Sequence, residues 1–137
     1  MMEDIALLVL RLVLGGVFVA HGAQKLFGSF GGPGIEGTTG FHEQLGIKPA
    51  KPMAILAGLA EFIGGILVIA GFLTPLAALA LIGVMVVAVL SVHLKNGFFA
   101  ANGGYEFNLV LVAVAATLVL VGSGAYGLDA ALGIFWN

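Results

Sequence analysis

Long apolar stretches separated by short polar or glycine-rich connections dominate the chain. Four stretches reach the length of about 20 mostly apolar residues that a helix needs to cross about 30 Å of hydrocarbon. They cover residues 5–24, 53–72, 76–95 and 105–122. Because little chain is left between them, the pattern predicts one domain over residues 1–137, an all-α integral membrane bundle of four transmembrane helices.

The connections predict how the helices follow one another. Residues 25–52 form a glycine-rich loop between the first and second spans, and a short amphipathic piece at residues 41–45 suits a helix on the membrane surface. Thr74 and Pro75 predict a tight turn, since proline disfavours helix at the preceding residue and begins a new helix well. The second and third spans should therefore be antiparallel neighbours.

Composition fits a membrane protein better than a soluble one. Hydrophobic residues make up 61% of the chain and charged residues 9%, whereas soluble domains are about half apolar and about a quarter charged. A domain of this size leaves roughly a third of its unfolded surface exposed, and the few polar residues cannot cover it. We therefore expect the lipid bilayer to cover it. The 22 glycines suit helices that pack closely in lipid.

Charge and cysteine content exclude further classes of protein. The net charge is −2 and the five basic residues are scattered, so the basic stripe of a nucleic-acid-binding protein is missing and no nucleic acid partner is predicted. The chain has no cysteine, so it forms no disulfide and supplies no thiol for redox chemistry. Any electron transfer would need a bound cofactor or a partner protein. The start, Met-Met-Glu-Asp, lacks the basic residues of a signal peptide, so we expect the first helix to be retained.

Polar and ionisable side chains within the spans are the candidate functional residues, because a charge near the bilayer centre costs about 3 kcal/mol even on mild insertion scales. They are Arg11, His21, Lys25, Glu61, His93, Glu106 and Asn108. Glu61 is the deepest carboxyl, about 12 Å inside the end of its span that adjoins the glycine-rich loop. It shares a helix face with Gly58 and Gly65, so it should face another helix, most simply the first.

Each candidate also has a structural interpretation. Arg11 could extend toward nearby headgroups, and Glu61 could be a structural ion pair or a hydrogen-bonded neutral carboxyl. We expect Arg11 and Glu61 to pair, because either alone would be an uncompensated charge in a low-dielectric bundle. The histidines are more typical of the membrane interface than of a metal site, since they lack the close spacing of metal ligands, and no metal site is predicted. Glu106 could be a solvated charge and Asn108 an interhelical hydrogen-bonding group.

Several motifs resemble those of the DoxX family, and the likeness covers nearly the whole chain. The motifs are Arg11, His21-Gly-Ala-Gln-Lys25, Gly34-Ile-Glu-Gly37 with Phe41, Gly58-Leu-Ala-Glu61-Phe-Ile-Gly64-Gly65, and Gly71-Phe-Leu-Thr74-Pro75. The resemblance implies a multi-pass, four-helix protein of the inner membrane. It also implies kinship with a subunit of thiosulfate:quinone oxidoreductase and with a membrane component of a mycobacterial oxidoreductase complex. Vitamin K epoxide reductase-like bundles are more distant, and their cysteine mechanism cannot apply to this chain.

Three functions are compatible with these residues. The resemblance implies a redox-associated subunit, at most the membrane subunit of a quinone-linked oxidoreductase, that binds a quinone or similar isoprenoid and works with a soluble redox partner protein. In this hypothesis the catalytic proton carriers are Glu61 and His21, and the ligand contacts are Arg11, Lys25, His93, Glu106 and Asn108. Alternatively, the protein is a non-enzymatic lipid carrier or a membrane scaffold that docks a partner protein. A third possibility is a small proton-coupled transporter in which Glu61 titrates.

Two further expectations concern assembly and orientation. Four helices can hardly enclose a ligand, and exposed glycine-rich faces favour packing between copies, so we expect a homo-oligomer. The face that holds the long loop carries Lys25, Lys48, Lys51 and Lys95, whereas the opposite face has only Arg11 and the α-amino group. Since basic residues favour cytoplasmic loops, we predict the loop face in the cytoplasm and both termini outside.

Overall fold

The computed structural model describes residues 1–136, which form six α-helices and contain no strand. The helices are α1 (Met2–Phe27), α2 (Gly34–Gln44), α3 (Ala50–Ala70), α4 (Thr74–Ala88), α5 (Glu106–Val121) and α6 (Leu128–Leu132). Between them lie the 3-10 turns η1 (Ser29–Gly31), η3 (Leu94–Asn96) and η4 (Ala100–Asn102) and the π-helical turn η2 (Val89–His93). The prediction of an all-helical protein is confirmed.

Three helical segments are long and apolar enough to cross a membrane. They are α1, α3 and the continuous segment Thr74–Asn96, in which η2 and η3 extend α4. A fourth helix, α5, is apolar but has only 16 residues. The predicted ranges 5–24, 53–72, 76–95 and 105–122 each overlap one of these four elements. By the length and composition of its helices, the chain is a helical membrane protein.

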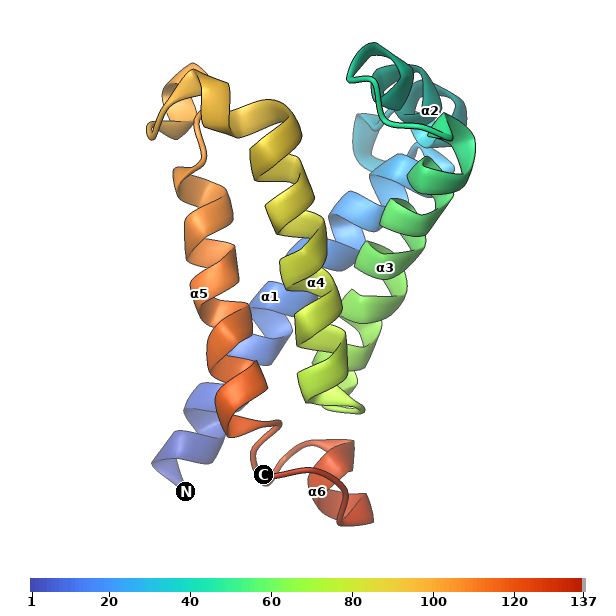
Figure 1. The fold of residues 1–137 in the computed structure, drawn as a ribbon. Coiled ribbons are helices and arrows are strands. Elements are labelled where there is room, and N and C mark those ends of the chain that lie inside the picture. Colours follow the sequence, from blue (N-terminus) through green and yellow to red (C-terminus); the bar gives the residue numbers. More distant parts are fainter. Residues whose placement is uncertain (137) are drawn as a thin grey trace.

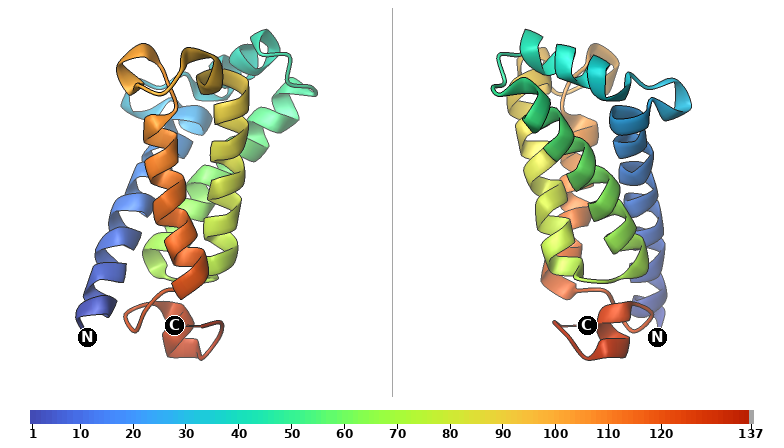
Figure 2. Two further views of the ribbon diagram at one scale, coloured as in Figure 1. Left: turned by 60° about the vertical axis from the view of Figure 1, so that its left-hand side comes forward. Right: turned by 90° about the vertical axis from the view of Figure 1, so that its right-hand side faces the viewer.

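The apolar helices run side by side along the molecule, and α2 lies across one end of them (Figures 1 and 2). We call the end that carries α2 the loop end. The N-terminus and α6 lie at the opposite end, which we call the termini end (Figures 1 and 2). The turn between α3 and α4 also lies at the termini end, and from it the two helices diverge toward the loop end (Figure 1).

Glycine and proline set the helix boundaries that matter for this arrangement. Gly71 ends α3 in the left-handed conformation, with φ 67°, which a glycine adopts without steric penalty. Pro75 then stands in the first turn of α4, where its missing N–H costs no helical hydrogen bond. The prediction that Thr74 and Pro75 connect antiparallel neighbours is confirmed.

The glycine-rich loop is more helical than the sequence suggested. Helix α2 spans 11 residues and begins seven residues before the predicted amphipathic piece at 41–45. Thr38 explains part of this difference, because its buried hydroxyl donates to the carbonyls of Gly34 at 2.8 Å and of Lys25 at 3.1 Å. This hydroxyl therefore ties α2 to the end of α1. Such a tertiary contact overrides the low helix propensity of glycine.

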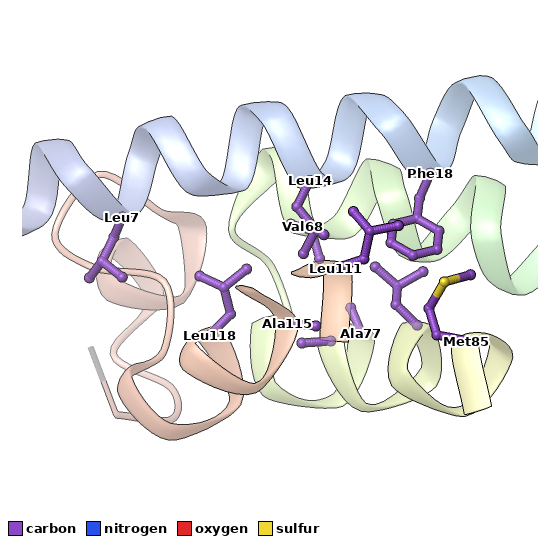
Figure 3. Packing of buried hydrophobic residues seen from close by; sticks show 11 residues of the cluster. Leu7, Leu14, Phe18, Val68, Ala77, Met85, Leu111, Ala115 and Leu118 are labelled. Carbon is purple, nitrogen blue, oxygen red and sulfur yellow. The ribbon is translucent and has the colours of Figure 1, made fainter. Parts of the chain in front are cut away.

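The apolar core lies between α1, α4 and α5, with one contribution from α3 (Figure 3). Its labelled members are Leu7, Leu14, Phe18, Val68, Ala77, Met85, Leu111, Ala115 and Leu118 (Figure 3). Large apolar side chains also cover the outside of the bundle, as with Val13 at 62% exposed and Leu120 at 78% exposed. A helix that is apolar on both faces fits a position between a protein core and lipid.

Helices α1 and α3 approach each other through glycine. A methyl group on Gly15 would lie 2.6 Å from the carbonyl oxygen of Gly65, and one on Gly65 would lie 2.7 Å from that of Gly15. A methyl group on Gly22 would lie 2.8 Å from the Cα of Phe62. These separations are too short for any Cβ atom, so larger residues would force the helices apart. The expected role of Gly65 in close helix packing is confirmed.

Candidate functional site

Glu61 and Lys25 form an ion pair between α3 and α1. Lys25 Nζ donates a hydrogen bond to Glu61 Oε1 at 2.7 Å, and the side chain of Glu61 is only 2% exposed whereas that of Lys25 is 28% exposed. The second oxygen, Glu61 Oε2, is buried and has no hydrogen-bond partner in the protein. Lys25 therefore compensates the buried carboxylate, while Oε2 retains the capacity to accept a proton or a hydrogen bond.

The predicted pairing of Arg11 with Glu61 is wrong, although Glu61 does face the first helix. Arg11 lies against Gly71, where even a methyl group would collide with the guanidinium. Glu61 precedes Gly71 by ten positions on α3, which corresponds to about 15 Å along the helix. That distance excludes a direct contact and a single bridging water. Helical periodicity gave Glu61 the correct face but could not give its depth relative to Arg11 on the antiparallel neighbour.

Arg11 instead belongs to a second buried cluster at the termini end. Its guanidinium, with the residue 1% exposed, donates from Nη2 to the carbonyl of Tyr126 at 3.2 Å and is attracted by the charge of Asp129. Asp129 is itself fully buried, and its carboxylate accepts the backbone N–H groups of Leu73 at 2.7 Å and Thr74 at 2.9 Å. It thereby caps the N-terminus of α4. Sequence reasoning missed Asp129 because it acts on residues 55 positions away.

His21 does not join Glu61. Gly22 packs against Phe62, which follows Glu61, so His21 is at the same depth in the bundle. Its imidazole is nevertheless exposed, and its Nδ1 makes a hydrogen bond of 2.8 Å with the carbonyl of Val17 in the same helix. The structure thus separates the two residues for which we predicted a shared catalytic role.

His93, Glu106 and Asn108 hold the connection between α4 and α5. His93 Nδ1 lies 2.8 Å from the carbonyl of Gly103, and Glu106 Oε1 accepts the backbone N–H of Ala100 at 2.9 Å. Asn108 is buried, donates to the sulfur of Met85 at 3.4 Å, and borders a small apolar hollow of about 170 Å³. The contacts of His93 and Glu106 order the connecting segment, that of Asn108 joins α5 to α4, and none of them involves Lys25 or Glu61.

A cavity of about 790 Å³ lies at the loop end between α2, α3 and α4, and we call it the loop-end cavity. Its walls on α3 and α4 consist of small and apolar residues. They are Met53, Leu56, Ala57, Ala60, Ala80, Gly83, Val84, Val87 and Ala88. Leu56 is 58% exposed and Val87 54% exposed, so the cavity can be entered from the outer surface of the bundle. Of the seven candidate residues, Lys25 is the one that lines this cavity.

His42 on α2 also lines the loop-end cavity, and sequence reasoning did not select it. Its Nδ1 is buried without a hydrogen-bond partner in the protein. Burial, reinforced by the positive charge of Lys25, lowers the pKa of His42 below its ordinary value of 6.5. His42 is therefore neutral at neutral pH. The amphipathic pattern of residues 41–45 was a usable signal, but it did not show which side chain faces the bundle.

The loop-end cavity has the properties of a site for an amphiphilic molecule. Its long walls are apolar, and its polar side chains are Lys25 from α1, Thr38 and His42 from α2, and Ser91 from η2. Ligand pockets commonly have volumes of about 300 to 1,000 Å³ and combine apolar walls with a few polar groups that fix the ligand's orientation. Within residues 1–136, no group of three or more His, Asp or Glu side chains is arranged to hold a metal ion.

The chain is similar to known membrane proteins. The sequence model of the DoxX family matches residues 6–94. The chain is 32% identical to "Putative oxidoreductase CatD" of Bacillus subtilis, over 92% of this chain and 86% of that protein. It is 28% identical to "Inner membrane protein YqjF" of Escherichia coli over 98% of both chains. It is 34% identical to "Uncharacterized membrane protein Rv3486" of Mycobacterium tuberculosis, over 72% of this chain and 60% of that protein. No solved structure matches.

The apolar helices, the buried charges and these relatives together define a helical membrane protein. More specifically, the chain belongs to the DoxX family, as its sequence motifs indicated.

Proposed function

We propose that this protein is a redox-associated membrane subunit that binds a quinone or a similar isoprenoid in the loop-end cavity. The observation that carries the proposal is that Lys25, whose charge is compensated by the buried Glu61, lines an apolar cavity of about 790 Å³. The apolar walls on α3 and α4 suit an isoprenoid tail, while Lys25 and His42 suit the oxygen atoms of a ring.

Charge favours a neutral head group over an anionic one. Lys25 is the cation that lines the cavity, and the carboxylate of Glu61 lies 2.7 Å from its Nζ. Burial and Lys25 together lower the pKa of His42, which keeps its imidazole neutral. A phosphate or fatty-acid carboxylate would therefore meet little net positive charge. A quinone needs only donors for its carbonyl oxygens, which lysine and histidine supply.

Quinone chemistry also fits the carboxyl at this site. Reduction of a quinone to a quinol takes two electrons and two protons. Lys25 lines the cavity and is hydrogen-bonded to Glu61, so this pair can hold and exchange protons next to the ligand, with Lys25 as the group that reaches it. The electrons must come from elsewhere, because the chain has no cysteine, so we propose a soluble redox partner. The relative CatD is named a putative oxidoreductase, which supports a redox role for this protein.

A lipid carrier or scaffold is the second candidate function. It is favoured by the apolar character of the cavity walls and by their access to the outer surface of the bundle, which an acyl chain would also exploit. In this case the Lys25–Glu61 pair fixes the register of α1 and α3 and takes part in no reaction. A copurified phospholipid in place of a quinone is the result that distinguishes it.

The proposed membrane arrangement is multi-pass, with α5 as a fourth span. Its 16 residues extend about 24 Å, somewhat less than the hydrocarbon thickness of about 30 Å, which local bilayer thinning can accommodate. The name of YqjF supports an inner-membrane location. The lysines of the loop end favour its placement in the cytoplasm, where a soluble partner could approach. Copies of the chain would pack through the exposed apolar faces.

Extraction of the purified protein, followed by mass measurement, tests the proposed function. We expect a quinone in the parent protein and its loss from Gly83→Phe, since Gly83 lines the cavity and a Cβ atom added there would have no neighbouring atom within 4 Å. Gly16→Phe is the matched control, because Gly16 is equally open but lies on α1 outside the cavity lining. If the parent protein contains a phospholipid that Gly83→Phe removes, the result supports the lipid-carrier function. If neither the parent nor the variants contain a ligand, the result overturns the quinone site.

A further inference from the structure

We propose that His42 is the residue that binds the head-group oxygen of the ligand and selects a ring that carries such oxygens over a plain hydrocarbon. This inference rests on the proposed function, because it concerns the same loop-end cavity. It names a group that neither the motifs nor the relatives assign. The juxtaposition that carries it is an imidazole and a lysine that line one cavity, the imidazole having one nitrogen without a partner in the protein.

The hydrogen bonds of the cavity separate His42 from Lys25 and Thr38. Lys25 Nζ is bonded to Glu61, and the hydroxyl of Thr38 donates to two backbone carbonyls. His42 Nδ1 has no partner in the protein and is buried from solvent. A buried polar atom without a partner destabilises a protein unless something else satisfies it. Because this nitrogen is closed to solvent while His42 lines the adjoining cavity, a ligand there can bond to it once the imidazole turns toward the cavity.

The charge of His42 determines which ligands it can bind. At neutral pH the imidazole is uncharged, so one ring nitrogen donates and the other accepts a hydrogen bond. It can therefore bind a quinone carbonyl as a donor or a quinol hydroxyl as an acceptor. A neutral ring with oxygens fits both possibilities, whereas an alkylated benzene offers neither. His42 is thus suited to retain the ligand in its oxidised and reduced states.

The position of His42 on α2 also explains how the ligand could reach it. α2 lies across the loop end and packs on both α1 and α3, while the cavity wall formed by α3 and α4 is exposed to the outside. A tail can enter along the apolar walls, and the ring then comes to rest against α2. The head group would contact His42 and Lys25, which both line the cavity.

Binding measurements with two matched probes test the assignment. The probes are a decyl-substituted benzoquinone and decylbenzene, which have the same tail but differ in the ring oxygens, titrated into the protein in nanodiscs. We expect the parent to prefer the quinone roughly five- to tenfold, the value of a single buried hydrogen bond. His42→Leu should abolish the preference, and His42→Asn, which retains hydrogen-bonding groups, should keep most of it. Gln44→Leu is the control, since Gln44 is exposed on the same helix outside the cavity lining.

The possible outcomes separate the inference from the proposed function. If the parent binds neither probe beyond its partitioning into protein-free nanodiscs, the quinone site itself is wrong. If the parent prefers the quinone and His42→Leu retains that preference, the site stands and the role of His42 is overturned. Equal loss of preference in His42→Asn and Gln44→Leu would also overturn it, because the effect would then reflect α2 as a whole. Circular dichroism and thermal midpoints establish that each variant is folded.

Discussion

The molecule contains two buried charge clusters that use the same chemistry at opposite ends of the bundle. At the termini end, Arg11 and Asp129 lie among backbone groups of the α3–α4 turn and of the C-terminal segment. At the loop end, Lys25 and Glu61 lie beside a cavity of about 790 Å³. A buried charge therefore does not by itself mark a functional site. The accessible space next to the loop-end pair distinguishes it from the termini-end cluster.

The two clusters also differ in what the carboxylate does. Both oxygens of Asp129 accept backbone N–H groups, and the residue is fully buried. Glu61 uses one oxygen for Lys25 and leaves the other without a protein partner. A fully satisfied carboxylate stabilises a fold, whereas one with an unused oxygen retains capacity for a ligand or a proton. Substitution at the two ends should therefore affect different properties.

The largest loss of stability should follow Asp129→Ala. This change removes the two hydrogen bonds to a charged group that cap α4, and it leaves Arg11 without its nearby negative charge. We expect a destabilisation of about 3 kcal/mol or more, seen as a lower thermal midpoint in detergent. Ligand content per folded protein should be unchanged. A thermal midpoint equal to that of the parent would show that the termini-end cluster is not structural.

Smaller losses of stability are expected at the loop end. Lys25→Met leaves the buried carboxylate of Glu61 without a counter-charge, and Glu61→Gln removes that charge. Each variant should lower the free energy of unfolding by about 1 to 3 kcal/mol, a range that allows for the partial exposure of Lys25. The double variant should be more stable than the sum of the single effects predicts. Arg11→Met combined with Glu61→Gln should instead give additive losses, because the two residues are about 15 Å apart in depth. Additivity for Lys25 and Glu61 in thermal unfolding would contradict the pairing.

The smallest effect concerns the protonation of His42. Burial and the charge of Lys25 lower its pKa, so protons bind the unfolded state more readily than the folded state. Stability should therefore fall slightly as the pH drops below 6.5, the ordinary value, toward the lowered pKa. NMR titration of the histidine ring signals should assign His42 a pKa below 6.5, and Lys25→Met should raise it. If the pKa of His42 is the same in Lys25→Met as in the parent, the charge of Lys25 does not affect the imidazole of His42.

The features that sequence alone predicts are those that depend on neighbouring residues in the chain. The apolar runs predict the helices, and Thr74 with Pro75 predicts the turn between α3 and α4. The partner of Glu61 depends instead on the relative depth of α1 and α3, which the close contact of Gly22 with Phe62 fixes. Helical periodicity gives the face of a residue but not this register.

Two residues illustrate what periodicity cannot supply. Asp129 caps a helix that begins 55 residues earlier, so no local pattern relates the two. His42 belongs to a polar stretch, and its contact with the cavity exists only because α2 folds across α1 and α3. Both roles arise from tertiary packing. In such bundles the relative depth of polar residues on neighbouring helices decides which of them meet.

Photolabelling with an azido-quinone that carries a decyl tail tests the central claim most directly. The account predicts that label attaches to peptides that line the loop-end cavity, residues 33–47, 53–60 and 80–92, and not to residues 122–136 at the termini end. Excess unlabelled quinone and the Gly83→Phe substitution should both abolish this labelling. Label spread over the lipid-facing surface of all four apolar helices, insensitive to competitor and to Gly83→Phe, would contradict the account.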